Sequence, residues 1–166
     1  DSGSIPGITY DTTVYKVVVN VTDDGNGQLK GTTQYYKSNG ENGYSDTAER
    51  DNVAKFVNSY AANSVTVTLK ATKILDVQVG TRTLNAGEFS FELLDKTNNA
   101  VSATAKNDEN GNVTFTLNFT QQDVGEKTYV ISEVNNNLGG IKYDNRKYEV
   151  TFNVTDDGEG QLVASN

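Results

Sequence analysis

Three polar side chains stand where the alternation of their segments predicts apolar ones. Lys73 shares the parity of the apolar positions in 65–75, whereas Lys70 falls on the polar parity of the same segment. Glu133 and Asn58 each share the parity of aromatic residues on their own segments. A buried ammonium group without a partner costs several kcal/mol, so an inward lysine must pair, lose its proton or extend its amine to solvent. An amine, a carboxyl and a carboxamide are thus predicted to face hydrophobic cores.

The elements that must position these side chains are β-strands. The chain contains 15 Gly and one Pro and is rich in Thr, Val, Asn and Tyr, a composition typical of strands joined by polar turns. The sequence therefore predicts an all-β fold, an Ig-like β-sandwich. The expected strands are 15–22, 65–75, 87–94, 113–119, 128–134 and 148–155, and in the first of them Val17, Val19 and Val21 are expected to face inward. A short helical turn is expected at 120–123, and hairpin turns are expected at 23–27, 108–112 and 156–160.

One segment of the chain occurs twice. Residues 8–29 and 141–162 are identical at 14 of 22 positions and lie 133 positions apart. A period of that length indicates a whole domain that recurs in a tandem array of β-sandwich repeats. We therefore predict that residues 1–62 are the C-terminal portion of an upstream repeat. Residues 63–166 are then the N-terminal and central portion of the next repeat, without its last strand.

The stretch from Asp46 to Ala62 is ambiguous. Several of its apolar residues approximate helical spacing, while Ala54, Phe56, Asn58 and Tyr60 alternate as in a strand.

Composition excludes most enzyme chemistries. The chain has no Cys, His, Met or Trp, so cysteine nucleophiles, Ser-His triads and thiolate or histidine metal sites are ruled out, and we expect no cofactor and no metal. The acidic stretches 23–27 and 156–160 could suggest calcium loops, but no later acid completes a ligand set. A net charge of −8 disfavours nucleic acid and anionic membranes as partners, and no apolar run is long enough to span a membrane.

Four stretches resemble the isopeptide-linkage domain of Gram-positive pilins, the fold of the streptococcal major (T-antigen) pilin. They are VTLKATKIL, YVISEV, the GIKYD-type sequence that follows it, and AKFVNSY. In that family a strand lysine attacks the side chain of a last-strand asparagine, and a neighbouring acid assists. The resemblance implies that Lys73 is the nucleophile, Glu133 the assisting acid and Asn58 the carbonyl donor of a cross-link. The match of AKFVNSY also favours a strand from Ala54 to Tyr60, with Asn58 facing inward, over the helical spacing of that stretch.

The order of these residues departs from the family, because Asn58 precedes Lys73 and Glu133. We therefore expect Asn58 to serve a different repeat or chain, and the repeat period places its counterpart for Lys73 near position 191. A bond between Lys73 and Asn58 of one chain would be strained, because the short connection cannot recross a domain about 25 Å long.

The resemblance implies a structural repeat of a Gram-positive surface pilus or adhesin stalk, extracellular and attached to the cell surface or cell wall. The protein would not be an enzyme, since the cross-link is a single self-modification. Its expected partners are neighbouring repeats or copies of itself, with a host or matrix ligand also open. The alternative is a carbohydrate- or host-protein-binding β-sandwich module that uses Tyr35, Tyr36 and Tyr44 as a stacking surface. A hydrolase ranks third, because nothing in the sequence brings two carboxylates together.

Overall fold

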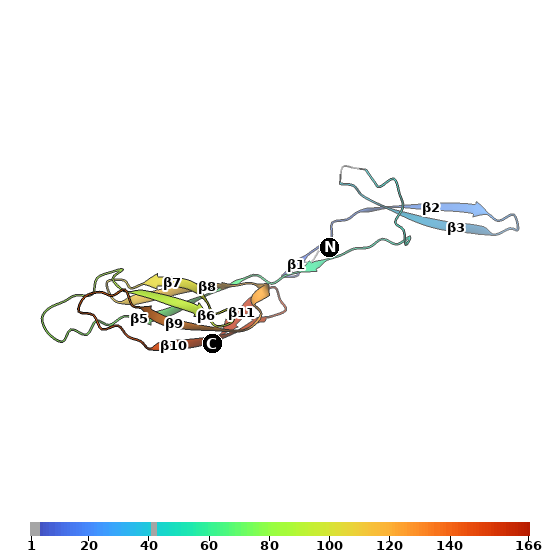
Figure 1. The fold of residues 1–166 in the computed structure, drawn as a ribbon. Coiled ribbons are helices and arrows are strands. Elements are labelled where there is room, and N and C mark those ends of the chain that lie inside the picture. Colours follow the sequence, from blue (N-terminus) through green and yellow to red (C-terminus); the bar gives the residue numbers. More distant parts are fainter. Residues whose placement is uncertain (1–3, 41–42) are drawn as a thin grey trace. The chain divides into compact units, whose positions relative to one another are not determined.

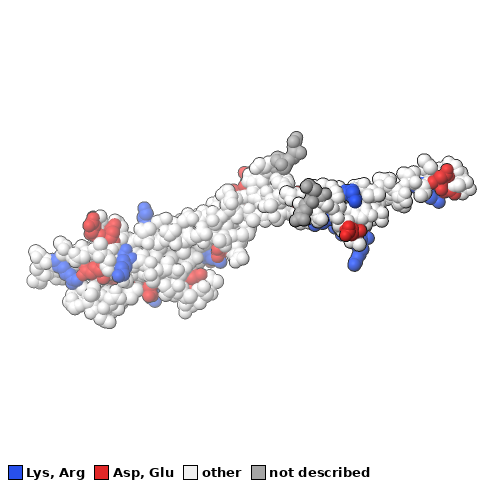
Figure 2. Space-filling view, turned by 90° about the horizontal axis from the view of Figure 1, so that it is seen from above, with Lys and Arg blue, Asp and Glu red and all other residues white. Residues whose placement is uncertain are grey.

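The computed structural model describes residues 4–40 and 43–166 and contains no α-helix in those ranges. The all-β prediction is confirmed. The chain forms two compact units: unit 1 holds residues 8–60, and unit 2 holds residues 61–166 together with residues 5–7 (Figure 1). No helix among the described residues is long and apolar enough to cross a membrane. On the face drawn in Figure 2, acidic and basic groups are scattered among uncharged residues and form no large patch of one sign.

Unit 2 is a sandwich of two antiparallel sheets. The larger sheet has the strand order β11-β10-β9-β6-β7 and the smaller one pairs β5 with β8 (Figure 1). A 3-10 turn, η1, occupies Gln121–Asp123 after Thr120, where the short helical turn was predicted. The strands are β5 (Val65–Thr72), β6 (Ser90–Asp95), β7 (Ala100–Lys106), β8 (Asn112–Phe119), β9 (Gly125–Val134), β10 (Lys147–Asp156) and β11 (Leu162–Ser165).

The core of unit 2 follows from strict alternation on both sheets. On β8, alternate residues from Val113 to Phe119 are buried and the residues between them are exposed, so one face of the smaller sheet packs inward. The larger sheet contributes Phe91 and Leu93 of β6, Tyr129 and Ile131 of β9, and Phe152 and Val154 of β10. Lys73 and Glu133 lie just beyond these buried stretches, at the ends of β5 and β9.

Unit 1 consists of two strand pairs. The short strands β1 (Ile8–Thr9) and β4 (Ser59–Tyr60) pair with each other, and β2 (Tyr15–Asp23) forms a hairpin with β3 (Leu29–Lys37). The alternation of β2 predicts an inward apolar face, yet Val17, Val19 and Val21 are exposed. Alternation fixes which side chains share a face, and that face of β2 is not covered by described residues of unit 1.

Other details of the predicted strands were also wrong. Strand β7 was missed, because its sequence AVSATAK alternates small residues that give a weak apolar signal. Strands β3 and β11 were not predicted either, although the hairpin turn before each of them was. The predicted strand 54–60 is reduced to the two residues of β4, and Asn58 before it is exposed instead of facing inward. The helical alternative for this stretch is also wrong, since no helix forms there.

Candidate functional site

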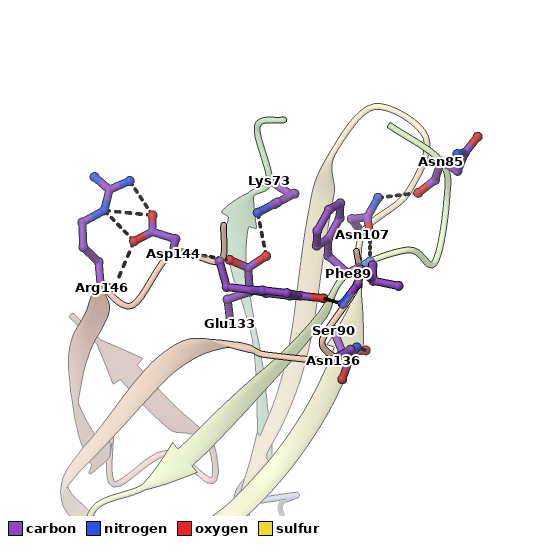
Figure 3. Close-up of polar contacts among 11 residues, drawn as sticks. Lys73, Asn85, Phe89, Ser90, Asn107, Glu133, Asn136, Asp144 and Arg146 are labelled. Atoms are coloured by element: carbon purple, nitrogen blue, oxygen red, sulfur yellow. Dashed lines mark hydrogen bonds and ion pairs between the residues drawn. The ribbon is translucent and has the colours of Figure 1, made fainter. Parts of the chain in front are cut away.

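Lys73 and Glu133 meet in the interior of unit 2. Lys73 Nζ donates a hydrogen bond to Glu133 Oε1 at 2.6 Å, and the two side chains are 10% and 3% exposed (Figure 3). They lie 60 positions apart in the sequence: Lys73 directly follows β5 of the smaller sheet, and Glu133 is in β9 of the larger one. Removing an ammonium and a carboxylate from water costs free energy, which their mutual pairing and further hydrogen bonds offset. The packing of the surrounding strands keeps the two groups in this buried position.

The amine of Lys73 also rests on an aromatic ring. Its Nζ lies 4.2 Å from the centroid of the fully buried Phe89 ring, which is close enough for a cation–π contact when the amine is charged. The Phe89 ring in turn packs edge-on against Tyr143 with centroids 6.1 Å apart. The apolar floor below Lys73 excludes water from one side of the amine.

Asn107 fixes the position of Phe89. This side chain is 2% exposed, and its Oδ1 accepts a hydrogen bond from the Phe89 backbone N–H at 2.8 Å. Its Nδ2 donates to the carbonyl oxygen of Asn85 (Figure 3) and to that of Asp108, both at 2.8 Å. Asn107 therefore ties the loop before β6 to the turn before β8 and holds the floor of the site in place.

The backbone of Lys73 is anchored on Gly111 in the hairpin before β8. The Lys73 N–H donates to the Gly111 carbonyl at 2.7 Å. Gly111 has a φ of +84°, and a Cβ atom at this position would lie 2.2 Å from the Lys73 carbonyl oxygen. The close approach requires glycine on both grounds.

We expect Gly111→Ala to destabilise unit 2 by about 2 kcal/mol, because the added Cβ combines an unfavourable φ with a backbone overlap beside Lys73. Denaturant unfolding measures the effect. Gly139→Ala is the matched control, since a Cβ there meets no atom within 4 Å. Equal stability of the two variants would contradict the proposed anchor.

The second oxygen of Glu133 is also occupied. Glu133 Oε2 accepts a hydrogen bond from the backbone N–H of Asp144 at 2.8 Å (Figure 3). Hydrogen bonds from the Arg146 side chain and backbone lower the pKa of the Asp144 carboxyl to about 2, and Lys73 adds a smaller effect of the same sign. An open groove lies beside the pair, lined among others by residues 71–79, at and after the end of β5, and by residues 140–146. An extended segment could therefore reach Lys73 from this side.

Asn58, the third predicted site residue, lies in unit 1. Its side-chain Oδ1 accepts a hydrogen bond from the Asp11 backbone N–H at 2.9 Å. The carboxylate of Asp11 holds the same segment, because its Oδ2 accepts the Val57 N–H at 2.6 Å. The structure thus brings Lys73 and Glu133 together, while Asn58 belongs to the unit assigned by sequence to the upstream repeat.

Two of the three tyrosines of the alternative hypothesis, Tyr36 and Tyr44, contact the amine of Lys16. Lys16 Nζ lies 4.8 Å from the ring centroid of Tyr36 and 5.4 Å from that of Tyr44. The amine therefore lies over one face of each of these two rings, where a sugar could otherwise stack. In the described part of the chain, no group of three or more His, Cys, Asp or Glu residues is arranged to hold a metal ion.

Sequence reasoning missed the supporting residues Phe89, Asn107, Gly111 and Asp144. A single buried asparagine or a glycine in a turn gives no periodic signal, so Asn107 and Gly111 could not be singled out. Asp144 did leave a signal, because the Tyr-Asp pair recurs at the same place in both copies of the repeated segment, with Asp11 in the first copy.

The fold and the buried pair define an all-β structural domain with an amine and a carboxyl held in contact inside a sandwich. A family model described as the Spy0128-like isopeptide-containing domain (FctA) matches residues 1–61 and 69–166. The chain belongs to this family of Gram-positive pilin isopeptide domains. A search of curated proteins finds no match.

Proposed function

We propose that the chain is a structural repeat of a Gram-positive surface pilus or adhesin stalk, and that an autocatalytic isopeptide bond stabilises each complete repeat. The observation that carries this proposal is the buried contact of 2.6 Å between Lys73 Nζ and Glu133 Oε1 beside an open groove. Membership of the isopeptide family supports the same chemistry. The repeat assignment of residues 1–62 and 63–166 is part of the proposal.

The reaction joins Lys73 to the side chain of an asparagine. The uncharged amine of Lys73 adds to the amide carbon, the C–N bond to the asparagine nitrogen breaks, and one ammonia leaves. Glu133 takes a proton from the attacking nitrogen and returns a proton to the departing one, so it ends in its starting state. An apolar environment favours the neutral form of an amine, which is the form that can add to the amide carbon.

Proximity lowers the activation barrier of the reaction. Groups held in contact react as an intramolecular pair, an effect worth roughly 7–11 kcal/mol of the barrier. The pairing of Lys73 with Glu133 and the floor formed by Phe89 keep the amine in one place before the asparagine arrives. The process is a single self-modification and involves no turnover, so the protein is not an enzyme.

The asparagine that serves Lys73 comes from a strand equivalent to 54–60, either downstream in the parent protein or from another copy. The bond would join the first and last strands of a repeat, so that a pulling force bypasses the hydrogen bonds between strands. It would also restrict the unfolded chain, as a disulfide does. Such a fibre subunit acts outside the cell, at the cell surface, with other copies of itself as partners.

Intact mass spectrometry tests the cross-link. In a chain extended through the counterpart of Asn58, near position 191, we expect the mass to fall by about 17 Da for each bond, because one ammonia is lost. The extended chain with Lys73→Ala should not lose the ammonia that the Lys73 bond releases. Lys70→Ala is the matched control, since the Lys70 side chain lies on the exposed face of β5, and it should lose ammonia as the unaltered chain does. The full unreacted mass in the extended chain would overturn the proposal.

The 166-residue chain offers a second readout. If Asn58 of one copy reacts with Lys73 of another, a dimer or ladder that survives boiling in detergent should appear, and Lys73→Ala should return it to monomers. If the chain stays monomeric, Lys73 should stay unreacted at full mass.

A further inference from the structure

The two copies of the repeated segment use the same backbone amide in two ways. In unit 1 the N–H of Asp11 donates to the side-chain oxygen of Asn58. In unit 2 the N–H of Asp144, which stands at the same place in the repeat, donates to Glu133 Oε2. The acceptor of this backbone N–H is therefore the asparagine side-chain oxygen in unit 1 and the glutamate carboxylate in unit 2.

The aspartate carboxylates are also arranged alike. Asp11 Oδ1 accepts the N–H of Thr13 at 2.7 Å, and Asp144 Oδ1 accepts the N–H of Arg146 at 3.0 Å, two residues on in each case. In unit 1 the other oxygen, Asp11 Oδ2, holds the Val57 N–H immediately before Asn58. In unit 2 the corresponding oxygen, Asp144 Oδ2, is engaged by the exposed guanidinium of Arg146.

A tyrosine completes the match. In unit 1 the hydroxyl of Tyr15 donates to the Lys55 carbonyl at 2.9 Å and accepts from the Lys55 N–H at 3.2 Å, while its ring packs edge-on against Phe56. The equivalent residue of unit 2 is Tyr148, which is 57% exposed and lines the groove beside Lys73. Unit 1 therefore shows how an asparagine-bearing segment sits on Tyr15 and Asp11, and unit 2 presents the same two residue types at its groove.

We propose that Asp144 is the positioning residue for the asparagine that reacts with Lys73. Its carboxylate accepts the N–H of the residue before that asparagine, and its own N–H donates to the asparagine side-chain oxygen. This inference rests on the proposed function. The occupant of the groove is a segment with the sequence of residues 54–60, seated as that segment is seated in unit 1.

The position of the Asp144 amide explains why this contact would assist the reaction. The N–H already points at Glu133, whose other oxygen holds the Lys73 amine, so an asparagine oxygen bound there lies beside both reacting groups. Negative charge grows on that oxygen when the amine adds to the amide carbon, and a fixed N–H donor stabilises it. When the Asp144 N–H donates to the asparagine oxygen instead of to Glu133 Oε2, that carboxylate oxygen also becomes free to accept and return protons.

A synthetic peptide with the sequence of residues 51–62 tests the positioning role. The receptor is the 166-residue chain with Asn58→Ala, so that its own segment cannot react, and the rate of adduct formation is measured by mass against peptide concentration. We expect Asp144→Ala to raise the half-saturating peptide concentration and to lower the ratio of limiting rate to that concentration about 10- to 100-fold. Asp144→Asn keeps an uncharged acceptor and should restore part of the loss.

Glu159→Ala is the matched control, since Glu159 is an exposed carboxylate of unit 2 that does not line the groove. It should leave both kinetic parameters unchanged. Equal kinetics for Asp144→Ala and the unaltered receptor would overturn the positioning role while leaving the cross-link intact. Absence of any adduct in the unaltered receptor would instead count against the proposed function.

A measurement on unit 1 decides the docking geometry independently of the reaction. Asp11→Ala should speed hydrogen exchange of the Val57 amide about 10-fold or more, because that N–H loses its acceptor. Asp46→Ala, an exposed aspartate of the same unit, should not. Unchanged exchange in Asp11→Ala would overturn the docking arrangement from which the role of Asp144 is inferred.

Discussion

Glu133→Gln is expected to slow formation of the isopeptide bond by about 10²- to 10⁴-fold, the usual contribution of a positioned acid–base group. Glutamine keeps the size of the side chain and an oxygen that can accept from Lys73 or from the Asp144 N–H. It cannot take the proton from the attacking nitrogen or return one to the departing nitrogen. Both the addition of the amine and the loss of ammonia should therefore slow. The measurement is the time course of the mass loss of about 17 Da in the extended chain.

Glu126→Gln is the matched control for this prediction. Glu126 lies on the same strand, β9, and is exposed. It should react at the rate of the unaltered chain. Bond formation at an undiminished rate in Glu133→Gln would show that the carboxyl acts only as a structural partner of Lys73.

Asn107→Ala is expected to reduce the free energy of unfolding of unit 2 by about 3 kcal/mol. Truncation leaves the Phe89 N–H and the carbonyls of Asn85 and Asp108 without the bonds that they make to this buried side chain. Each unsatisfied buried group costs about 1–3 kcal/mol, and a water molecule that enters the cavity replaces some of the lost hydrogen bonds and reduces the total. The measurement is denaturant unfolding, compared between Lys73→Ala and the double variant Lys73→Ala, Asn107→Ala. Neither protein can form the cross-link, so the difference reports Asn107 alone.

Asn110→Ala, in the same hairpin but exposed, should change the stability by less than about 0.5 kcal/mol. A similarly small effect of Asn107→Ala would mean that water replaces the side chain in the network. Because Asn107 holds Phe89 under the amine, we also expect this variant to slow bond formation when Lys73 is present.

The inward direction of Lys73 could be predicted because the period of a strand is two, and a lysine among alternating valines and leucines has only one face available. The turns were predictable for a similar reason: Asp and Gly at fixed offsets favour the left-handed and hydrogen-bonded conformations of tight hairpins. Asp108 shows this, since its Oδ1 accepts the N–H groups of both Asn110 and Asn112.

The supporting residues of the site could not be found in this way. Asn107 acts through contacts with Asn85 and Phe89, which lie about 20 positions away, and such contacts leave no local pattern. Asp144 was visible as part of a repeated sequence, but its repetition did not reveal that its backbone amide, and not its side chain, meets Glu133.

The sequence by itself determined the all-β class, the repeated segment, the turns and the parity that turns Lys73 and Glu133 toward an interior. Tertiary structure alone decided that these two side chains meet across 60 positions, that Asn58 bonds to the Asp11 amide, and that the valines of β2 are exposed. The physical reason is that alternation depends only on the local backbone, which sets the face on which a side chain lies. What covers that face depends on the packing of distant strands, and no local pattern encodes it.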